Sequence, residues 1–339
     1  MKKLTSIILL LLFAINSIIA CSSPTPPSTP DDEEYQLKIG YLNGPTGMGM
    51  AKLINDNGGK EGNEKYSFTA STAELVGPSV ISGAFDIACM PTNTAAMLYN
   101  NSKNIEILAI NCLNSIYIIT DQNTEINSFE DLEGKTIYTS KAGTPAPILK
   151  TLLEKYGINA TVTSEYNGQV IAKPENLSAV ITDGGASIVA APEPIITAAI
   201  LALKKDTSKD IEYSIDLDLG EVWNEKFDTE IAMGCIVANK NVINTHKDAV
   251  DNFLKEYMAS IEFIANKENT DASAQYIVDA GIMAAVPAAK TALTNLNNGG
   301  NIDYIDGILM KETLIKIYKA FGMALIGGKL PEDDFYYEK

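Results

Sequence analysis

The sequence of 339 residues contains no arginine and only one histidine, His246. Without a guanidinium group, no side chain can hold a carboxylate, sulfonate or phosphate through two parallel hydrogen bonds. A single histidine cannot supply a usual zinc site, which takes several His or Cys ligands. His246 stands at an expected helix start rather than beside a nucleophile, so a catalytic triad is not predicted. The sequence therefore predicts no metal, no cofactor and no catalytic residue.

Positive charge is scarce as a whole. The chain has 26 lysines against 43 acidic residues, and its formal net charge is −17. Phosphate backbones repel so acidic a protein, so a nucleic-acid partner is not expected. Apolar residues make up 46% and charged residues 20% of the chain, which is typical of a folded protein with a packed core. The length fits two domains or one large domain.

Cysteine is also rare, with four in the chain. Cys89, Cys112 and Cys235 each stand inside an apolar run. Because buried cysteine behaves as a small hydrophobic residue, we predict three buried thiols. One disulfide among the three stays open as the alternative, and spacing does not select the pair.

The N-terminus has the order of a secretory signal. Lys2 and Lys3 precede the apolar run 7–15, which is too short to span a membrane, and the string Ile-Ile-Ala leads to Cys21. This string resembles the lipobox of bacterial lipoproteins, which implies cleavage after residue 20 and a lipid on Cys21. A plain signal peptide is the alternative. Residues 21–34 are rich in Pro, Ser, Thr and acid and predict a flexible tether. The expected location is the cell envelope, outside the cytoplasm and lipid-anchored to the membrane.

From residue 35, strand and helix patterns alternate, which predicts an α/β protein with parallel sheets. After residue 230 one more strand precedes a helical region that is expected to wrap onto a lobe already formed. Thr245 is the predicted N-cap of the long helix there. The acidic segment 216–222 is interpreted as a solvated loop.

Two pairs of segments look alike and indicate two lobes. The segment 87–96 (IACMPTNTAA) is similar to 188–197 (IVAAPEPIIT), and 44–54 is similar to 143–153. In each, a strand runs into a Gly/Pro turn and then into a helix. Since turns draw on Gly and Pro everywhere, a chance likeness is the alternative.

Ligands of open α/β sheets bind at the carboxyl ends of strands. The turns expected there carry Gly44–Met50, Thr92, Asn93, Ser140, Gly143, Thr144 and Glu193. Together they predict a joint cleft, with backbone N–H groups of 46–48 and 140–144 facing the ligand. Each turn alone could simply cap its helix.

Three side chains carry the expectations about ligand chemistry. Lys141 is the cation of the second-lobe turn. Tyr117 or Tyr166 is expected to stack on a ligand ring. Glu193 is expected to meet an amino group of the ligand, because an unpaired buried carboxylate is costly. The alternative for Glu193 is a helix cap that faces solvent.

Several motifs together resemble one family. The lipobox, "GPTGMGMAKLI", "MPTNTAAMLYN", "DLEGKTIY", "PEPIIT" and "GGKLPEDDFYY" are similar to those of solute-binding lipoproteins of ABC importers, of the nitrate, sulfonate and taurine type. That group includes binders of thiamine-precursor pyrimidines. The resemblance covers residues 35–339. It implies a two-lobed periplasmic-binding fold of class II, in which each lobe is a mostly parallel sheet flanked by helices and the ligand lies between the lobes.

The resemblance assigns residues 35–120 and 230–339 to the first lobe and 121–229 to the second. It implies a cleft lined by Pro45, Thr46, Gly47, Met48, Thr92, Asn93, Ser140–Thr144 and Glu193. The implied protein is a monomer and not an enzyme. It binds a small molecule, either a nitrogen heterocycle similar to a thiamine precursor or a sulfonate, and delivers it to a permease and its ATPase. The missing arginine departs from the sulfonate and nitrate binders. The alternatives are an enzyme of cofactor-precursor synthesis on the same fold, and a signalling lipoprotein without transport.

Overall fold

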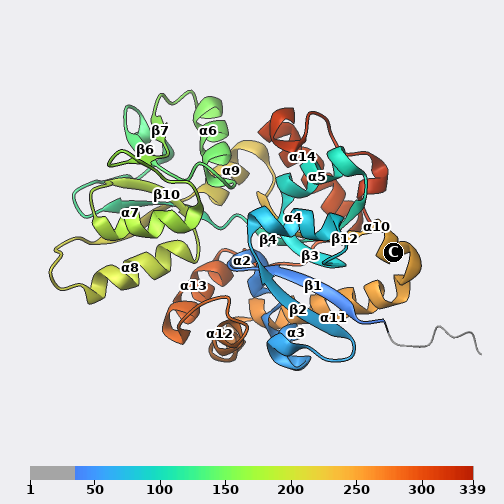
Figure 1. The fold of residues 1–339 in the computed structure, drawn as a ribbon. Helices are drawn as coiled ribbons and strands as arrows, with labels where there is room; N and C mark the ends of the chain where they lie inside the picture. The colour runs from blue at the N-terminus through green and yellow to red at the C-terminus, as the bar shows by residue number, and fades with distance from the viewer. Residues whose placement is uncertain (1–34, 339) are drawn as a thin grey trace, which may run out of the picture. The chain divides into compact units, whose positions relative to one another are not determined.

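The computed structural model describes residues 35–338, which form two five-stranded sheets flanked by helices (Figure 1). The strand order is β2-β1-β3-β12-β4 in the first sheet and β11-β5-β10-β6-β7 in the second. Each sheet carries its own helices, so the predicted two-lobed α/β fold is confirmed. The expected signal peptide, Cys21 and the tether lie outside the described residues.

The first sheet is mixed, so the expectation of mostly parallel sheets is wrong. β1 is parallel to β2 and β3, whereas β12 runs antiparallel to β3 and β4. The chain enters β12 on its return from the second lobe, and this return explains its opposite direction. The strands are β1 (Leu37–Leu42), β2 (Tyr66–Ser71), β3 (Ile87–Pro91), β4 (Ile105–Leu113) and β12 (Ala232–Asn239).

The second sheet is mixed in the same way. β10 is parallel to β6 and antiparallel to β5. Its strands are β5 (Ile116–Asp121), β6 (Thr136–Tyr138), β7 (Thr161–Thr163), β10 (Ile188–Pro192) and β11 (Tyr213–Asp218), with a separate hairpin of β8 (Glu165–Tyr166) and β9 (Gln169–Val170). β5 pairs in this sheet, so the chain leaves the first sheet before Ile116 rather than at residue 120.

Helices follow the strands in both lobes. β3 and β10 both end at a proline, Pro91 and Pro192, and both lead into a helix, as the internal likeness predicts. The first lobe has α2 (Pro45–Met48), α3 (Ala51–Asp56), η1 (Gly59–Glu61), α4 (Ala73–Ile81) and α5 (Thr92–Ser102). The second has η2 (Phe129–Leu132), α6 (Pro145–Tyr156), η3 (Pro174–Asn176), α7 (Leu177–Asp183), α8 (Ile195–Lys205) and α9 (Leu219–Phe227).

The last third of the chain is helical and adds to the first lobe, as expected. Its long amphipathic helix α11 buries its apolar face against the first sheet. The elements are α10 (Lys240–Thr245), α11 (Lys247–Ala265), η4 (Lys267–Asn269), α12 (Thr270–Asp279), α13 (Val286–Asn298), α14 (Gly307–Phe321), η5 (Met323–Ile326) and η6 (Asp333–Phe335).

Two local predictions in this part of the chain are wrong. Thr245 ends α10, and His246 is the N-cap of α11, where its ring stacks on Tyr35 at 3.6 Å. The segment 216–222 is not a loop, because it ends β11 and begins α9. The Asp218 carboxylate accepts a hydrogen bond of 2.7 Å from the Gly220 N–H and so caps α9.

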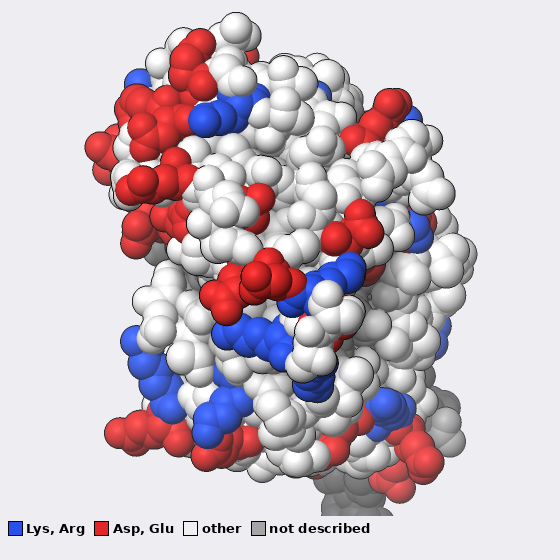
Figure 2. All heavy atoms as spheres, turned by 90° about the vertical axis from the view of Figure 1, so that its left-hand side faces the viewer, with Lys and Arg blue, Asp and Glu red and all other residues white. Residues whose placement is uncertain are grey.

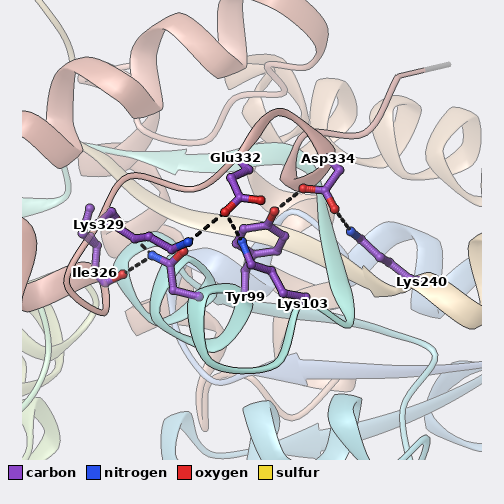
Figure 3. A network of polar contacts seen from close by, with 8 residues as sticks. Tyr99, Lys103, Lys240, Ile326, Lys329, Glu332 and Asp334 are labelled. Atoms are coloured by element: carbon purple, nitrogen blue, oxygen red, sulfur yellow. Dashed lines mark hydrogen bonds and ion pairs between the residues drawn. The ribbon is translucent and has the colours of Figure 1, made fainter.

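The C-terminal segment 332–337 packs against α5 and the outer edge of β4 (Figure 3). The Tyr337 N–H donates to the Ile107 carbonyl at 3.0 Å, which covers an otherwise open sheet edge. Asp334 accepts from the Tyr99 hydroxyl and pairs with Lys240 at 2.6 Å. Glu332 pairs with lysines 103 and 329 at 3.0 and 2.8 Å. The C-terminal segment thus holds the C-terminal half of α5. The first residues of α5 belong to the candidate site described below.

Cys89, Cys112 and Cys235 are buried free thiols, as predicted. Burial raises the pKa of the Cys89 and Cys112 thiols to about 12. Between residues 35 and 338, no helix is both long enough and apolar enough to cross a membrane.

Candidate functional site

Two chain segments connect the lobes, and they lie side by side. The first joins β4 to β5 through Asn114, and the second joins α9 to β12 through Glu230 and Ile231. The Asn114 side-chain oxygen accepts from the Ile231 N–H at 2.9 Å, and its amide donates to the Glu230 carboxylate. The Asn114 N–H also donates to the Ile231 carbonyl at 2.9 Å. These bonds fasten the two crossings to each other where a hinge between the lobes would bend.

The first-lobe turn after β1 is α2. Its residues do not all face a ligand, because Met48 is fully buried in the core and Gly47 is buried against the chain. The N–H groups of Gly47 and Met48 both donate to the Gly44 carbonyl at 3.0 Å. The prediction that these two N–H groups bind ligand is therefore wrong, since the short helical turn uses them itself. Pro45 and Thr46 keep partly exposed side chains.

The Asn111 side chain of β4 holds this turn in place by a hydrogen bond. Its amide donates to the Thr46 carbonyl at 3.0 Å and to the Tyr257 hydroxyl at 2.8 Å. Its side-chain oxygen is buried and finds no hydrogen-bond partner among the described residues. Because the Thr46 carbonyl can only accept, the amide orientation is set and the oxygen is the free atom. Gly234 of β12 leaves room here: a Cβ on it would lie 2.6 Å from Thr46 Oγ1 and 2.7 Å from Asn111 Oδ1.

The two residues predicted at the start of α5 have different roles. Thr92 is fully buried, and its hydroxyl donates to the Ala232 carbonyl at 2.5 Å. Its own carbonyl accepts from the Tyr318 hydroxyl at 2.9 Å. Thr92 thus fastens α5 to β12 and α14. Asn93 is only partly buried, yet its side-chain oxygen is buried and has no partner within residues 35–338.

The second-lobe turn follows β6. The Lys141 N–H donates to the Ile171 carbonyl at 2.8 Å, so it is not available to a ligand, and the Lys141 side chain is exposed. Ser140 is buried, and its hydroxyl donates to the Ala142 carbonyl at 2.8 Å. Gly143 has a φ of +90°, a conformation that favours glycine, and lies against Pro174. These contacts hold the turn in one conformation, and the Lys141 N–H is not a free donor for a ligand.

Thr144, at the start of α6, reaches the other lobe. Its hydroxyl donates to the Met233 sulfur at 3.6 Å. Met233 precedes Gly234, which lies against Thr46. The first residues of β12 therefore lie between the two predicted turns and bring them together. Just before the second turn, the buried Thr139 hydroxyl has no hydrogen-bond partner in the described part of the chain.

Glu193 is fully buried and joins the lobes (its predicted solvent-facing alternative is wrong). Oε1 accepts from the Thr197 hydroxyl at 2.8 Å and from the Asn295 amide of α13 at 2.6 Å. Oε2 accepts from the Thr197 N–H at 3.2 Å, so Glu193 also caps α8. Burial raises the pKa of the Glu193 carboxyl, against these hydrogen bonds, which lower it. The chain itself thus supplies the donors that we expected from the ligand.

The two candidate stacking tyrosines are occupied as well. Tyr117 is buried, and its hydroxyl donates to the Asn301 side chain at 2.9 Å, which is another contact between the lobes. Tyr166 donates to Asp183 and packs edge-on against Tyr138 at 5.6 Å between ring centroids. The buried Tyr117 ring presents no open face for stacking, whereas the Tyr166 ring is partly exposed and lines a hollow of the second lobe. The partners lie far along the chain, and no local pattern indicates them.

One ion pair joins the lobes among the described residues. Lys173, which precedes η3, pairs at 2.9 Å with Glu74 in the first turn of α4. Both side chains are about half exposed. The hydrogen bond from Lys173 lowers the pKa of Glu74 to about 2. Because exposed pairs contribute little, this contact adjusts the lobe arrangement rather than fixing it.

Figure 2 shows the left-hand side of Figure 1, with acidic side chains over its upper part, lysines in its lower half and acidic side chains again along its lower edge. Among residues 35–338, no group of three or more His, Cys, Asp or Glu side chains is placed to hold a metal ion.

Three residues near the site were missed by the sequence reasoning: Asn111, Met233 and Asn295. Asn111 had a local signal, because it is a single amide inside the apolar run ILAINCL. A lone polar residue in a buried strand needs a hydrogen-bond partner. Met233 and Asn295 had no such signal, since their contacts are with Thr144 and Glu193 of the other lobe.

Comparison with known proteins places this geometry in context. Residues 68–270 match the family model described as "NMT1/THI5 like". A search of the curated proteins found no match.

Three solved structures share the fold. An ABC transporter protein from Parabacteroides distasonis has a TM-score of 0.69 at 18% identity, covering 89% of this chain and 99% of its own. The ligand-binding component of an ABC-type import system from Staphylococcus aureus, with zinc bound, has a TM-score of 0.66 at 14% identity, covering 89% and 96%. The periplasmic aliphatic sulphonate binding protein SsuA from Escherichia coli has a TM-score of 0.65 at 14% identity, covering 89% and 92%. The two-lobed periplasmic-binding fold of class II is thus confirmed.

Proposed function

Because the chain belongs to the NMT1/THI5-like family, we propose that it is the solute-binding component of an ABC importer. It captures a small organic molecule between its lobes and delivers it to a membrane permease and its ATPase. Membership in this family, together with the fold of ABC import binding components, carries the proposal. The protein acts outside the cytoplasm, where such a component meets its solute.

We propose further that the ligand is a nitrogen heterocycle that donates hydrogen bonds, not a bare sulfonate or nitrate. Two buried oxygens of the candidate site, on Asn93 and Asn111, have no donor among the described residues. An unsatisfied buried acceptor is costly, and a ligand N–H would satisfy it. The nearby Glu193 carboxylate has only neutral donors as its hydrogen-bond partners within residues 35–338. The absence of arginine leaves no guanidinium to hold an anion.

A thermal-shift panel tests this ligand class. Aminopyrimidines at ~100 times their dissociation constant are expected to raise the free energy of unfolding by about 2.7 kcal/mol. Alkanesulfonates and nitrate are expected to leave it unchanged. Stabilisation by a sulfonate or nitrate, with none by any aminopyrimidine, would show the ligand class to be wrong.

A matched pair of variants tests the site itself. Asn93→Ala removes one acceptor and is expected to weaken binding of the stabilising heterocycle roughly tenfold, equivalent to about 1.4 kcal/mol. Asn101→Ala, at the exposed far end of α5, is expected to leave the affinity unchanged. Equal affinities for both variants would remove Asn93 from the site.

The proposed anchor is a lipid on Cys21. The supporting observation is the order of basic, apolar and small residues before it. Cys21→Ser is expected to release a soluble protein or to leave an uncleaved precursor. Phase partitioning in detergent measures this, and a variant that partitions like the native protein would disprove the anchor.

A further inference from the structure

Glu193 is a buried carboxylate whose surroundings change when the lobes separate. Two of its donors, the hydroxyl and the N–H of Thr197, belong to its own helix and stay with it. The third, the Asn295 amide, belongs to α13, which packs in the core of the first lobe. A separation of the lobes would remove this donor and let water take its place.

We propose that Glu193 couples closure of the two lobes to the uptake of a proton. In the closed arrangement its carboxyl is fully buried, and both oxygens accept hydrogen bonds from neutral donors. Burial without a compensating cation disfavours the charged form. In an open arrangement water solvates the carboxylate, so the charged form is favoured again.

The direction of the effect follows from linkage. The pKa of Glu193 is raised in the closed structure, so the closed form binds a proton more readily than the open form. Closure is therefore favoured as the pH falls through the closed-state pKa, and this advantage is lost as the pH rises above it. Each pKa unit between the two forms changes the closed-to-open ratio tenfold.

The other titratable groups around Glu193 do not replace it in this role. Lys290 is the charged residue of α13 and pairs with Asp271 at 2.5 Å. α2 and β10 carry no titratable residue, and the lysines of α8 lie in its last turn. Two further carboxylates, Asp218 and Glu221, lie near Tyr117 of β5. Their charges act on the Tyr117 hydroxyl, as the charge of Glu193 does. Burial raises the pKa of Asp218 too, which makes it the natural control.

The interlobe ion pair does not produce the same response. Lys173 lowers the pKa of Glu74 to about 2, so Glu74 stays ionised from pH 4.5 to pH 8. Because its pKa is lowered in this arrangement, Glu74 favours closure as the pH rises, which is opposite to the response expected of Glu193.

The experiment measures the lobe separation in the full chain without ligand. Spin labels on p-acetylphenylalanine at Glu61 of η1 and Lys205 of α8, both exposed, report one distance distribution at pH 5 and one at pH 8. The native chain is expected to show a several-fold larger short-distance population at pH 5. Glu193→Gln is expected to abolish the difference, and Asp218→Asn to preserve it.

A second variant keeps the test decisive if Glu193→Gln does not fold. Asn295→Ala removes a donor that acts only in the closed form, so the midpoint of the response is expected to move to higher pH. Thr197→Val removes a donor from both forms, so it raises both pKa values and is expected to change the total size of the response less than Asn295→Ala does. Identical distributions at both pH values in the native chain, or an unchanged midpoint in Asn295→Ala, would overturn the proposal.

The inference rests on the proposed function only in the assumption that the lobes open and close. Because no ligand enters the experiment, its outcome is independent of the thermal-shift panel. A failed panel with an intact pH response rejects the ligand class alone, whereas the reverse result rejects the proton coupling alone.

Discussion

Replacing Gly47 by valine is expected to destabilise the protein by about 3 kcal/mol or more, at the upper end of the cost of overpacking. A Cβ at this position would lie 1.9 Å from the Leu42 carbonyl oxygen, which is backbone and cannot rotate away. α2 must therefore shift, and the Thr46 carbonyl leaves the Asn111 amide that holds it. Urea unfolding measures the loss, and ligand binding is expected to fall with it.

A second glycine provides the control for this experiment. Gly77 is buried in α4, but a Cβ there would meet only the Leu98 methyl groups at 3.6 and 3.7 Å, which is ordinary contact. Gly77→Ala is expected to change stability little. A Gly47→Val protein with the native unfolding midpoint would contradict the assigned packing of α2. Gly47 is thus unsuited as a pure binding probe, because the substitution disrupts the turn itself.

Replacing Asn114 by alanine is expected to cost about 2–4 kcal/mol. Asn114 has a φ of +49°, which strains an alanine, and its side chain bonds both Ile231 and Glu230 across the two crossing segments. The substitution leaves the buried Ile231 N–H without its acceptor. Thermal or urea unfolding measures the total loss.

Two further variants separate the causes. Asn114→Gly relieves the backbone strain of the alanine variant but does not restore the lost hydrogen bonds. It is therefore expected to recover only about 1 kcal/mol of the lost stability. Asn167→Ala, at a φ of +50° in the exposed turn between β8 and β9, is expected to lose the backbone contribution and one exposed side-chain contact with Tyr166, but no buried hydrogen bond. If Asn114→Ala costs no more than Asn167→Ala, the amide does not fasten the crossings.

Local structure was largely predictable because its causes are local. Strands and helices alternate from residue 35 as expected, and β2 and α4 are examples, since alternation and turn residues within a few positions determine them. The exceptions also have local reasons. Asp218 caps a helix that the acidic composition of 216–222 concealed, and His246 takes the capping place expected of Thr245.

The candidate site was predictable only as a set of turns. The expected turns do follow the strands, and β12 brings Thr46 of one lobe near Thr144 of the other. The roles of single residues were not predictable. Thr92, Tyr117 and Glu193 resemble ligand contacts in the sequence, but distant parts of the chain already supply their hydrogen-bond partners.

The sequence by itself determined the family, the alternation of strands and helices, and the absence of a guanidinium for anions. These are properties of composition and of short motifs, and they do not depend on how the chain folds. Only the tertiary structure decided which buried polar groups have no hydrogen-bond partner within residues 35–338. The free oxygen of Asn111 and the proton-sensitive burial of Glu193 depend on contacts with Tyr257 and Asn295, each more than a hundred residues away. Such contacts form only when the chain closes on itself, because hydrogen bonding depends on distance in space and not on distance along the chain.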